Sequence, residues 1–207
     1  MPTQTFLNLP KEKQDIILEA SNKEFKRALL RDASINKIIK DAGISRGSFY
    51  TYFKDINDLY IYTLNKYQDK FYETVKESIK KTNGNILETT KLIYEKLIEE
   101  CTKEKQTYKN IFLNLNYNVS IKDQIEYNLD NKYRLIELIG KLDKKNLNIQ
   151  KEEELFYIID IIIGIVLHGL IEIFISDKDK EEILEKLEKQ IKLIEKGIYK
   201  KWKHFLN

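Results

Sequence analysis

The residues best suited to chemistry lie between positions 38 and 53, in the sequence IIKDAGISRGSFYTYF. On the short helix expected after Gly43, every outward side chain can donate a hydrogen bond. These side chains are Ser45, Arg46, Ser48, Thr51 and Tyr52. Ser45 and Arg46 stand at the start of the helix, where free backbone N–H groups favour a phosphate. Gly47 lets the backbone approach a DNA surface closely, and tyrosine hydroxyls can reach phosphates on either side of a groove.

Two short helices joined by Ala42-Gly43-Ile44-Ser45 are expected to position these donors. The first begins after Ser34, whose hydroxyl can cap it, and stops at Gly43, which permits a positive φ. Ser45 can cap the second, which runs to about Tyr52. The apolar residues expected to hold the pair together are Ile38, Ile39, Ile44, Phe49 and Phe53. The pattern predicts a helix-turn-helix, although many helical hairpins would give a similar hydrophobic pattern.

The chain as a whole is expected to be all-α. Its 207 residues include only seven glycines and two prolines, and apolar periodicity divides it into about nine helices. After a first helix from Pro10 and the pair above, the expected helices span about 56–82, 86–101, 104–117, 121–139, 152–175 and 180–205. Capping pairs begin three of them: Asp55 with Asp58, Asn85 with Glu88, and Asp179 with Glu182.

Basic charge is concentrated near the N-terminus. Residues 23–54 contain eight basic and three acidic side chains, a net charge of +5, whereas the whole chain carries +3. This region suits a polyanionic partner, although a solvated charged face is the commoner origin of such a pattern. Cys101 is the only cysteine, so no internal disulfide forms, and the N-terminus lacks the apolar core of a signal peptide. A cytoplasmic location and no metal site are expected.

The apolar segment 155–175 is long enough to be compared with a membrane span. It contains Asp160, His168 and Glu172, and each acid near a bilayer centre would cost about 2.5–3.5 kcal/mol. Together with Gly164 these residues recur every four positions along one stripe. We therefore expect a buried helix with one polar edge, and no membrane.

The last two helices, about 152–175 and 180–205, are expected to form a homodimer interface. The last helix repeats apolar residues at alternating spacings of three and four: Leu184, Leu187, Ile191, Ile194 and Ile198. The preceding helix is apolar nearly all round, so the two have more apolar surface than one small domain can bury. A C2 dimer is the simplest solution. The alternative is a monomer in which both helices are central.

Residues 17–60 resemble the DNA-binding domain of the TetR family of bacterial transcriptional regulators. The resemblance runs from Ile17 and Leu18 to Phe25, then to Ser34 and Ile35, and is strongest in AGISRGSFYTYF. It implies a DNA-binding domain over residues 1–54 and a ligand-binding and dimerisation domain over residues 55–207, connected by the helix at about 56–82. The remainder of the chain agrees with the family only in helix count and layout.

The resemblance also implies roles for individual residues. Ser45, Arg46, Gly47 and Ser48 would enter the major groove of operator DNA. Tyr50, Tyr52 and Lys54 would fix the register on the backbone, and Ser34 and Lys37 would touch phosphates. Two positions depart from the family pattern: Leu29 replaces a usual glycine, and Ile56 replaces a frequent lysine. The turn ALLRDAS must then close differently or extend the first helix, and Lys54 is expected to take over phosphate contact.

The implied function is a repressor released from its operator by a small-molecule effector, with a ligand-independent or architectural DNA-binding protein as the alternative. Catalysis is not expected, because His168 and Glu172 have no nucleophile motif, phosphate-binding glycine loop or metal set beside them. No cofactor is implied. A pocket for a lipophilic or aromatic effector would be lined by Tyr67, Phe71, Tyr108, Phe112, Tyr127, Phe156, Tyr157 and His168. The aromatic residues are equally compatible with plain core packing, and His168 is equally compatible with polar pairing at the dimer interface.

Overall fold

The structure is a computed structural model that describes residues 2–117, 133–134, 136–175 and 179–198. Within these ranges the chain is helical and contains no β-strand, which confirms the all-α prediction. The helices are α1 (Gln4–Leu7), α2 (Lys11–Arg27), the 3₁₀ turn η1 (Leu30–Asp32), α3 (Ile35–Ala42), α4 (Arg46–Tyr52), α5 (Ile56–Lys81), α6 (Ile86–Lys103), α7 (Lys105–Tyr117), α9 (Glu153–Ile175) and α10 (Lys180–Ile198). Most of the helix expected at 121–139 lies outside the described residues.

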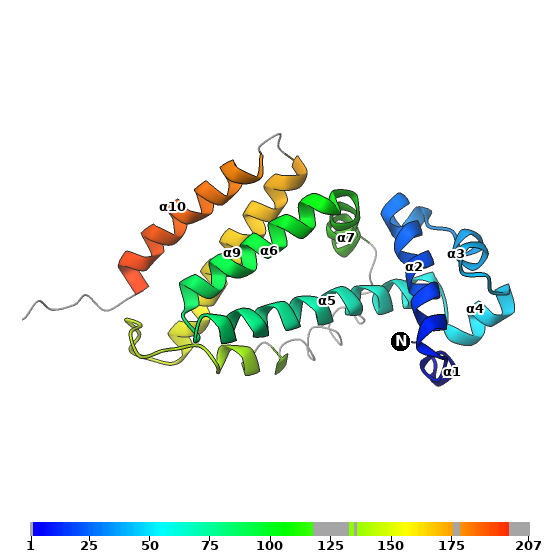
Figure 1. The fold of residues 1–207 in the computed structure, drawn as a ribbon, viewed down its shortest axis with the longest axis horizontal. Helices are drawn as coiled ribbons and strands as arrows, with labels where there is room; N and C mark the ends of the chain where they lie inside the picture. The colour runs from blue at the N-terminus through cyan, green and yellow to red at the C-terminus, as the bar shows by residue number, and fades with distance from the viewer. Residues whose placement is uncertain (1, 118–132, 135, 176–178, 199–207) are drawn as a thin grey trace, which may run out of the picture. The chain divides into compact units, whose positions relative to one another are not determined.

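The helices gather into two compact units. The N-terminal unit comprises residues 1–72 and 106–132, and the C-terminal unit comprises residues 73–105 and 133–207. The long helix α5 contributes to both (Figure 1). A functional boundary at residue 54 remains a prediction, since compactness alone does not assign function.

The core of the N-terminal unit is built from aromatic and branched side chains of α1 to α5. Phe6, Ile38, Phe49 and Phe53 are each completely buried. The ring of Phe6 lies 4.7 Å from that of Phe53 and 5.2 Å from that of Tyr62. The short helix α1, absent from the sequence prediction, therefore completes the core beneath α4.

Local capping sets several helix starts as predicted. The carboxylate of Asp55 accepts from the Asp58 N–H at 2.9 Å, and that of Asp179 accepts from the Glu182 N–H at 2.8 Å. The side chain of Asn85 accepts from the N–H groups of Leu87 and Glu88, both at 3.1 Å. These bonds satisfy donors that have no intrahelical partner.

In the C-terminal unit, α6, α9 and α10 pack side by side (Figure 1). Tyr94 and Ile98 of α6 are buried with Ile183 and Leu187 of α10. Gly169 of α9 is equally important, because a Cβ atom there would lie 1.7 Å from the Tyr94 hydroxyl oxygen. A larger side chain at this position would therefore force the ring of Tyr94 to move.

Helix α9 does not match the expected buried helix with one polar edge. Among the helices in the described residues, α9 is long and apolar enough to cross a membrane. The core helix of a soluble protein meets the same two criteria of length and composition. In the single subunit α6 and α10 leave apolar side chains of α9 uncovered: Tyr157 is 63% exposed, Ile161 57% and Leu167 50%. The prediction of burial was wrong for the subunit alone, since periodicity does not reveal how many neighbours cover a helix.

Candidate nucleic-acid interface

The turn between α3 and α4 has the geometry predicted from Gly43. This residue has φ +65° and ψ +31°, the left-handed conformation that favours glycine. The N–H of Ile44 donates to the Ile39 carbonyl at 3.0 Å, and the N–H of Gly43 donates to the Lys40 carbonyl at 3.3 Å. This pattern closes the C-terminus of α3 and redirects the chain into α4.

Ser45 caps α4 as predicted. Its hydroxyl oxygen accepts from the Ser48 N–H at 3.0 Å and lies 2.8 Å from the Ser48 hydroxyl. The two serines thus form a hydroxyl pair at the start of α4, where exposed N–H groups add a partial positive charge. The arrangement suits a hydrogen-bond acceptor such as a phosphate oxygen or a base edge.

The start of α3 is stabilised differently from the prediction. Ser34 occupies the N-cap position, but its hydroxyl makes no capping hydrogen bond. Its backbone N–H donates instead to the Glu24 carboxylate at 2.8 Å. Glu24 is 4% exposed and also accepts from the guanidinium of Arg27, which lowers the pKa of the carboxyl although burial opposes this. Helix α2 therefore anchors α3 through a buried charge, a link that sequence reasoning missed.

Arg46 is held in place on the outer face of the helix pair. Its Nη1 donates to the side-chain oxygen of Asn36 on α3 at 2.6 Å, and its Nη2 donates to the Tyr50 hydroxyl at 3.3 Å. Its guanidinium carbon lies 5.6 Å from the centre of the Tyr50 ring. Asn36 was not among the predicted site residues, because only the folded turn brings position 36 beside position 46.

The remaining predicted contact residues lie on the same helix pair or just beyond it. Lys37, Gly47, Thr51 and Lys54 are exposed, and Tyr50 is 47% exposed. Tyr52 is half-buried, with its ring 5.9 Å from that of Phe6.

Thr3, the N-cap residue of α1, fixes the C-terminal end of α4. The backbone N–H of Thr3 donates to the Tyr52 carbonyl at 2.9 Å, and its hydroxyl donates to the Thr51 carbonyl at 2.8 Å. Carbonyls at a helix C-terminus have no intrahelical partner, so these bonds stabilise the short helix. The hydroxyl of Thr51 donates back to the Gly47 carbonyl at 3.0 Å.

The two departures from the family pattern have local explanations. Leu29 has φ −65°, so the turn after α2 needs no glycine there and closes through η1, which buries Leu30. Ile56 begins α5 and packs, partly buried, against the N-terminal core. Its side chain thus contributes to packing.

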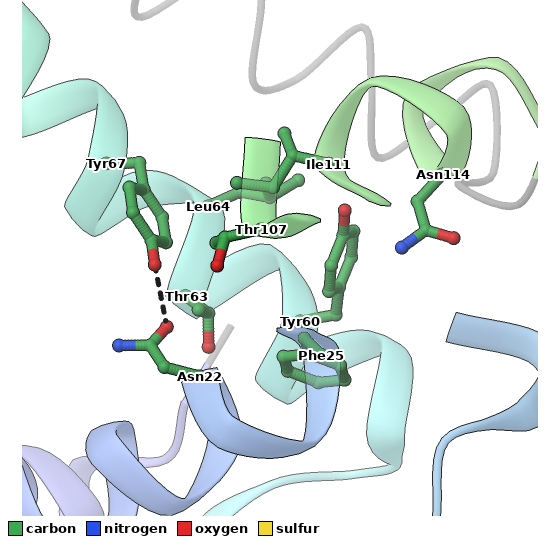
Figure 2. Close-up of a pocket in the computed structure, with 9 residues that line it drawn as sticks. All are labelled: Asn22, Phe25, Tyr60, Thr63, Leu64, Tyr67, Thr107, Ile111 and Asn114. Carbon is green, nitrogen blue, oxygen red and sulfur yellow. Dashed lines mark hydrogen bonds between the residues drawn. The ribbon is translucent and has the colours of Figure 1, made fainter. Parts of the chain in front are cut away.

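The predicted effector-binding residues are only partly brought together. The rings of Tyr67 and Tyr108 pack edge to face at 5.9 Å. Tyr67 also lines a small pocket within the N-terminal unit, and Figure 2 shows it beside Asn22, whose side-chain oxygen accepts from the Tyr67 hydroxyl at 3.2 Å. Phe71 is 39% exposed on α5. Tyr127 and the side chain of Phe112 lie outside the described residues.

The other predicted residues of this group lie on α9, in the C-terminal unit. Phe156, Tyr157 and His168 are exposed there in the single subunit. In the polar stripe, Glu172 pairs with Lys186 of α10 at 2.6 Å, and His168 Nδ1 lies 3.9 Å from the same carboxylate. At the Glu172 end of the stripe there is thus an ion pair between two packed helices with His168 at its edge, whereas Asp160 is exposed on α9.

Comparison with known proteins gives matches along most of the chain. Residues 17–63 match the family described as bacterial regulatory proteins, tetR family, and residues 85–198 match the tetracyclin repressor-like C-terminal domain. The second match alone covers more than half of the chain. The HTH-type transcriptional regulator YuxN of Bacillus subtilis (strain 168) is 32% identical over 94 residues, which are 43% of this chain and 32% of that protein's length.

Solved structures share the fold at low sequence identity. The transcriptional regulator FadR from Bacillus subtilis, in complex with stearoyl-CoA, has a TM-score of 0.68 at 16% identity and covers 90% of this chain and 100% of its own. A TetR family transcriptional regulator from Chloroflexus aurantiacus J-10-fl has a TM-score of 0.54 at 20% identity and covers 97% and 100%. With the helix-turn-helix and both family matches, these similarities lead to one conclusion. The chain belongs to the TetR family of bacterial transcriptional regulators.

Proposed function

We propose that this chain represses transcription by binding operator DNA through α4 and leaves the operator when a small-molecule effector binds. The observation that carries the proposal is the preorganised donor face of α4, where Arg46 is held by Asn36 and Tyr50. Family membership supports the regulatory role, and a DNA-binding regulator acts in the cytoplasm. The alternative, a ligand-independent or architectural protein, predicts binding that tolerates any sequence.

In this proposal the start of α4 enters the major groove. Ser45, Arg46, Gly47 and Ser48 approach base edges, and no Cβ on Gly47 obstructs the approach. Arginine pairs in a bidentate manner with guanine, so a guanine opposite Arg46 is expected in each half-site. Contacts to the phosphate backbone come from the flanking residues. They are Ser34, Lys37, Tyr50, Thr51, Tyr52 and Lys54.

Asn36 acts as a positioning residue for the guanidinium of Arg46 in this base contact. Its oxygen accepts one guanidinium N–H at 2.6 Å and so restricts the rotation of a long side chain. A preorganised arginine loses less conformational entropy when it meets DNA. Replacing Asn36 by alanine should therefore weaken discrimination at the guanine more than it weakens binding to unrelated DNA.

A homodimer through α9 and α10 supplies a second α4 helix, which binds the second half-site of the operator. Apolar side chains of both helices are uncovered in the single subunit, including Tyr157, Ile161 and Leu167 on α9 and Leu193 on α10, which is 69% exposed. Apolar surface of this kind on a soluble regulator suits a partner copy. Two-fold symmetry would then present two α4 helices to successive major grooves about 34 Å apart.

The effector is proposed to be lipophilic. FadR from Bacillus subtilis, which shares the fold, was solved with stearoyl-CoA, and this chain contributes aromatic side chains such as Tyr67 and Tyr108. The pocket beside Tyr67 leaves space of only about 10 Å³, so it would not hold an acyl chain as it stands. Long-chain acyl-CoA thioesters and free fatty acids are the first compounds to test for release from DNA.

The proposal is tested by selecting bound sequences from a random DNA library and measuring affinity for the enriched site. The Arg46→Ala protein should bind that site about 5- to 150-fold more weakly for each half-site, equivalent to about 1–3 kcal/mol. Arg31→Ala is the matched control, since Arg31 is exposed on η1 outside the helix pair. Failure to enrich any sequence, or equal affinity of the Arg46→Ala protein and wild type, would contradict sequence-specific reading by α4.

A further inference from the structure

Helix α9 has a covered side and an uncovered side. Its buried residues recur at spacings that place them together on the side packed by α6 and α10, and they are Leu155, Ile162, Gly169 and Ile173. With about 100° of rotation per residue, Gly164 lies on the opposite side. We call this side the outward face of α9. Its exposed residues are Phe156, Tyr157, Asp160, Ile161, Ile163, Gly164, Leu167 and His168.

Gly164 lies near the middle of the outward face and has open space around it. A Cβ atom there would meet nothing within 4 Å, so no described contact inside the subunit requires a glycine. Glycine destabilises a helix interior relative to alanine. It does, however, allow another backbone to approach closely, because no side chain separates the two. The position therefore suits the crossing point of α9 with a second helix.

The outward face carries one acid and one base, placed evenly about Gly164. Asp160 precedes the glycine by four residues and His168 follows it by four, so each lies about 6 Å from it along the helix axis. Residues spaced by four form the rows that pack into the grooves of a neighbouring helix. His168 is also the only basic residue in α9. A second α9 helix thus offers Asp160 one basic partner.

The charges select how two copies of α9 can meet. In a parallel pair related by a two-fold axis each residue meets its own counterpart, so Asp160 would face an identical carboxylate. In an antiparallel pair that crosses at Gly164, Asp160 faces the partner's His168. A covered carboxylate is costly unless it is paired, and an imidazole N–H can donate to it. Two-fold symmetry forms this pair twice.

We propose that two copies of this chain meet with their α9 helices antiparallel and crossing at Gly164, where Asp160 of each copy accepts a hydrogen bond from the partner's His168. The inference rests on the proposed homodimer and adds the position of its two-fold axis and its reciprocal polar pair. Within the subunit His168 Nδ1 lies 3.9 Å from the Glu172 carboxylate, beyond hydrogen-bond distance, and the side chain is 63% exposed. The imidazole is therefore accessible to a second copy.

Cysteine crosslinking of the full chain, in a Cys101→Ser background, tests this arrangement. A disulfide needs Cα atoms within about 7 Å, so Gly164→Cys should join two subunits under mild oxidation. Asp160→Cys alone is the matched control and should not, because its two copies would lie about 12 Å apart along the axis. Asp160→Cys combined with His168→Cys should crosslink, and this double variant decides if Gly164→Cys itself prevents association. Crosslinking by Asp160→Cys alone, or a dimer that no variant crosslinks, would overturn the proposal.

Analytical ultracentrifugation separates failure of this arrangement from failure of the homodimer. His168→Asp sets acid against acid and should raise the dimer dissociation constant at least about tenfold. Asp160→His combined with His168→Asp restores the pair in reverse and should return that constant to within about threefold of wild type. A wild-type dimer that His168→Asp leaves unchanged would refute the reciprocal pair alone. A wild-type protein that stays monomeric at every concentration would refute the homodimer as well.

Discussion

Replacing Glu24 by glutamine tests how α2 supports the helix pair. The carboxylate of Glu24 is 4% exposed and accepts at 2.8 Å from both the Ser34 N–H and Arg27 Nε. An amide keeps one acceptor for Ser34 but turns a donor toward Arg27. A hydrogen bond to a charged group contributes about 1.5–3 kcal/mol, and the 50% exposed side chain of Arg27 reduces that, so we expect a loss of about 2 kcal/mol. The melting temperature should fall by about 4–8 °C.

The pH dependence of this effect has a definite sign. The folded-state pKa of Glu24 is lowered from 4.5, chiefly by the Arg27 hydrogen bond. Its stabilisation is therefore present above the unfolded-state pKa and is lost as pH falls through the folded-state value. Circular dichroism melts of Glu24→Gln, wild type and Glu19→Gln, an exposed control on the same helix, should separate the first protein from the others at about pH 7. Equal melting of all three, or a gap that does not narrow toward about pH 3, would refute the reasoning.

Three further outcomes follow from the structure. Gly43→Ala should destabilise the helix pair by about 1–2 kcal/mol in urea titrations, purely from the positive φ, because a Cβ there meets nothing within 4 Å; Gly43→Asn should cost less. Gly169→Ala should lower stability by about 1–3 kcal/mol by forcing Tyr94 aside, and Tyr94→Phe should relieve part of that loss in the double variant. Cys101, whose thiol pKa is raised to about 12 by burial, should resist iodoacetamide in the native protein and react quickly after unfolding, as mass spectrometry would show.

Features that depend on neighbouring residues in the chain could be predicted from the sequence. Ser45, Asn85 and Asp179 cap helices with their own side chains, so a window of four residues contains the whole interaction. The turn at Gly43 is equally local, since one positive φ defines it.

Features that depend on distant partners were beyond such reasoning. Ser34 has the residue type of an N-cap, yet Glu24, ten positions earlier, takes its N–H. Helix α1 has four residues, too few to show a period, although Phe6 is a central core side chain. Tyr60 and Asn114 lie beside the same pocket only because α5 and α7 pack together.

The exposure of α9 follows the same logic. Apolar residues such as Ile161 and Leu167 show that the helix seeks apolar contact, but only the packed subunit reveals that α6 and α10 leave them uncovered. Hydrophobicity gives the tendency to be buried, whereas the number of covering neighbours is a property of the fold.

The central claim is that α4 reads a specific operator. The most direct test is the ratio of specific to non-specific DNA affinity, measured at several salt concentrations for Asn36→Ala, Arg46→Ala and wild type. On the selected operator, Arg46→Ala should lose affinity and Asn36→Ala should lose less, while on unrelated DNA of equal length Asn36→Ala should match wild type. Loss of one base contact lowers the ratio of specific to non-specific affinity at every salt concentration. If both variants keep the wild-type ratio, or if wild type itself binds the two DNAs equally, α4 is not the reading helix.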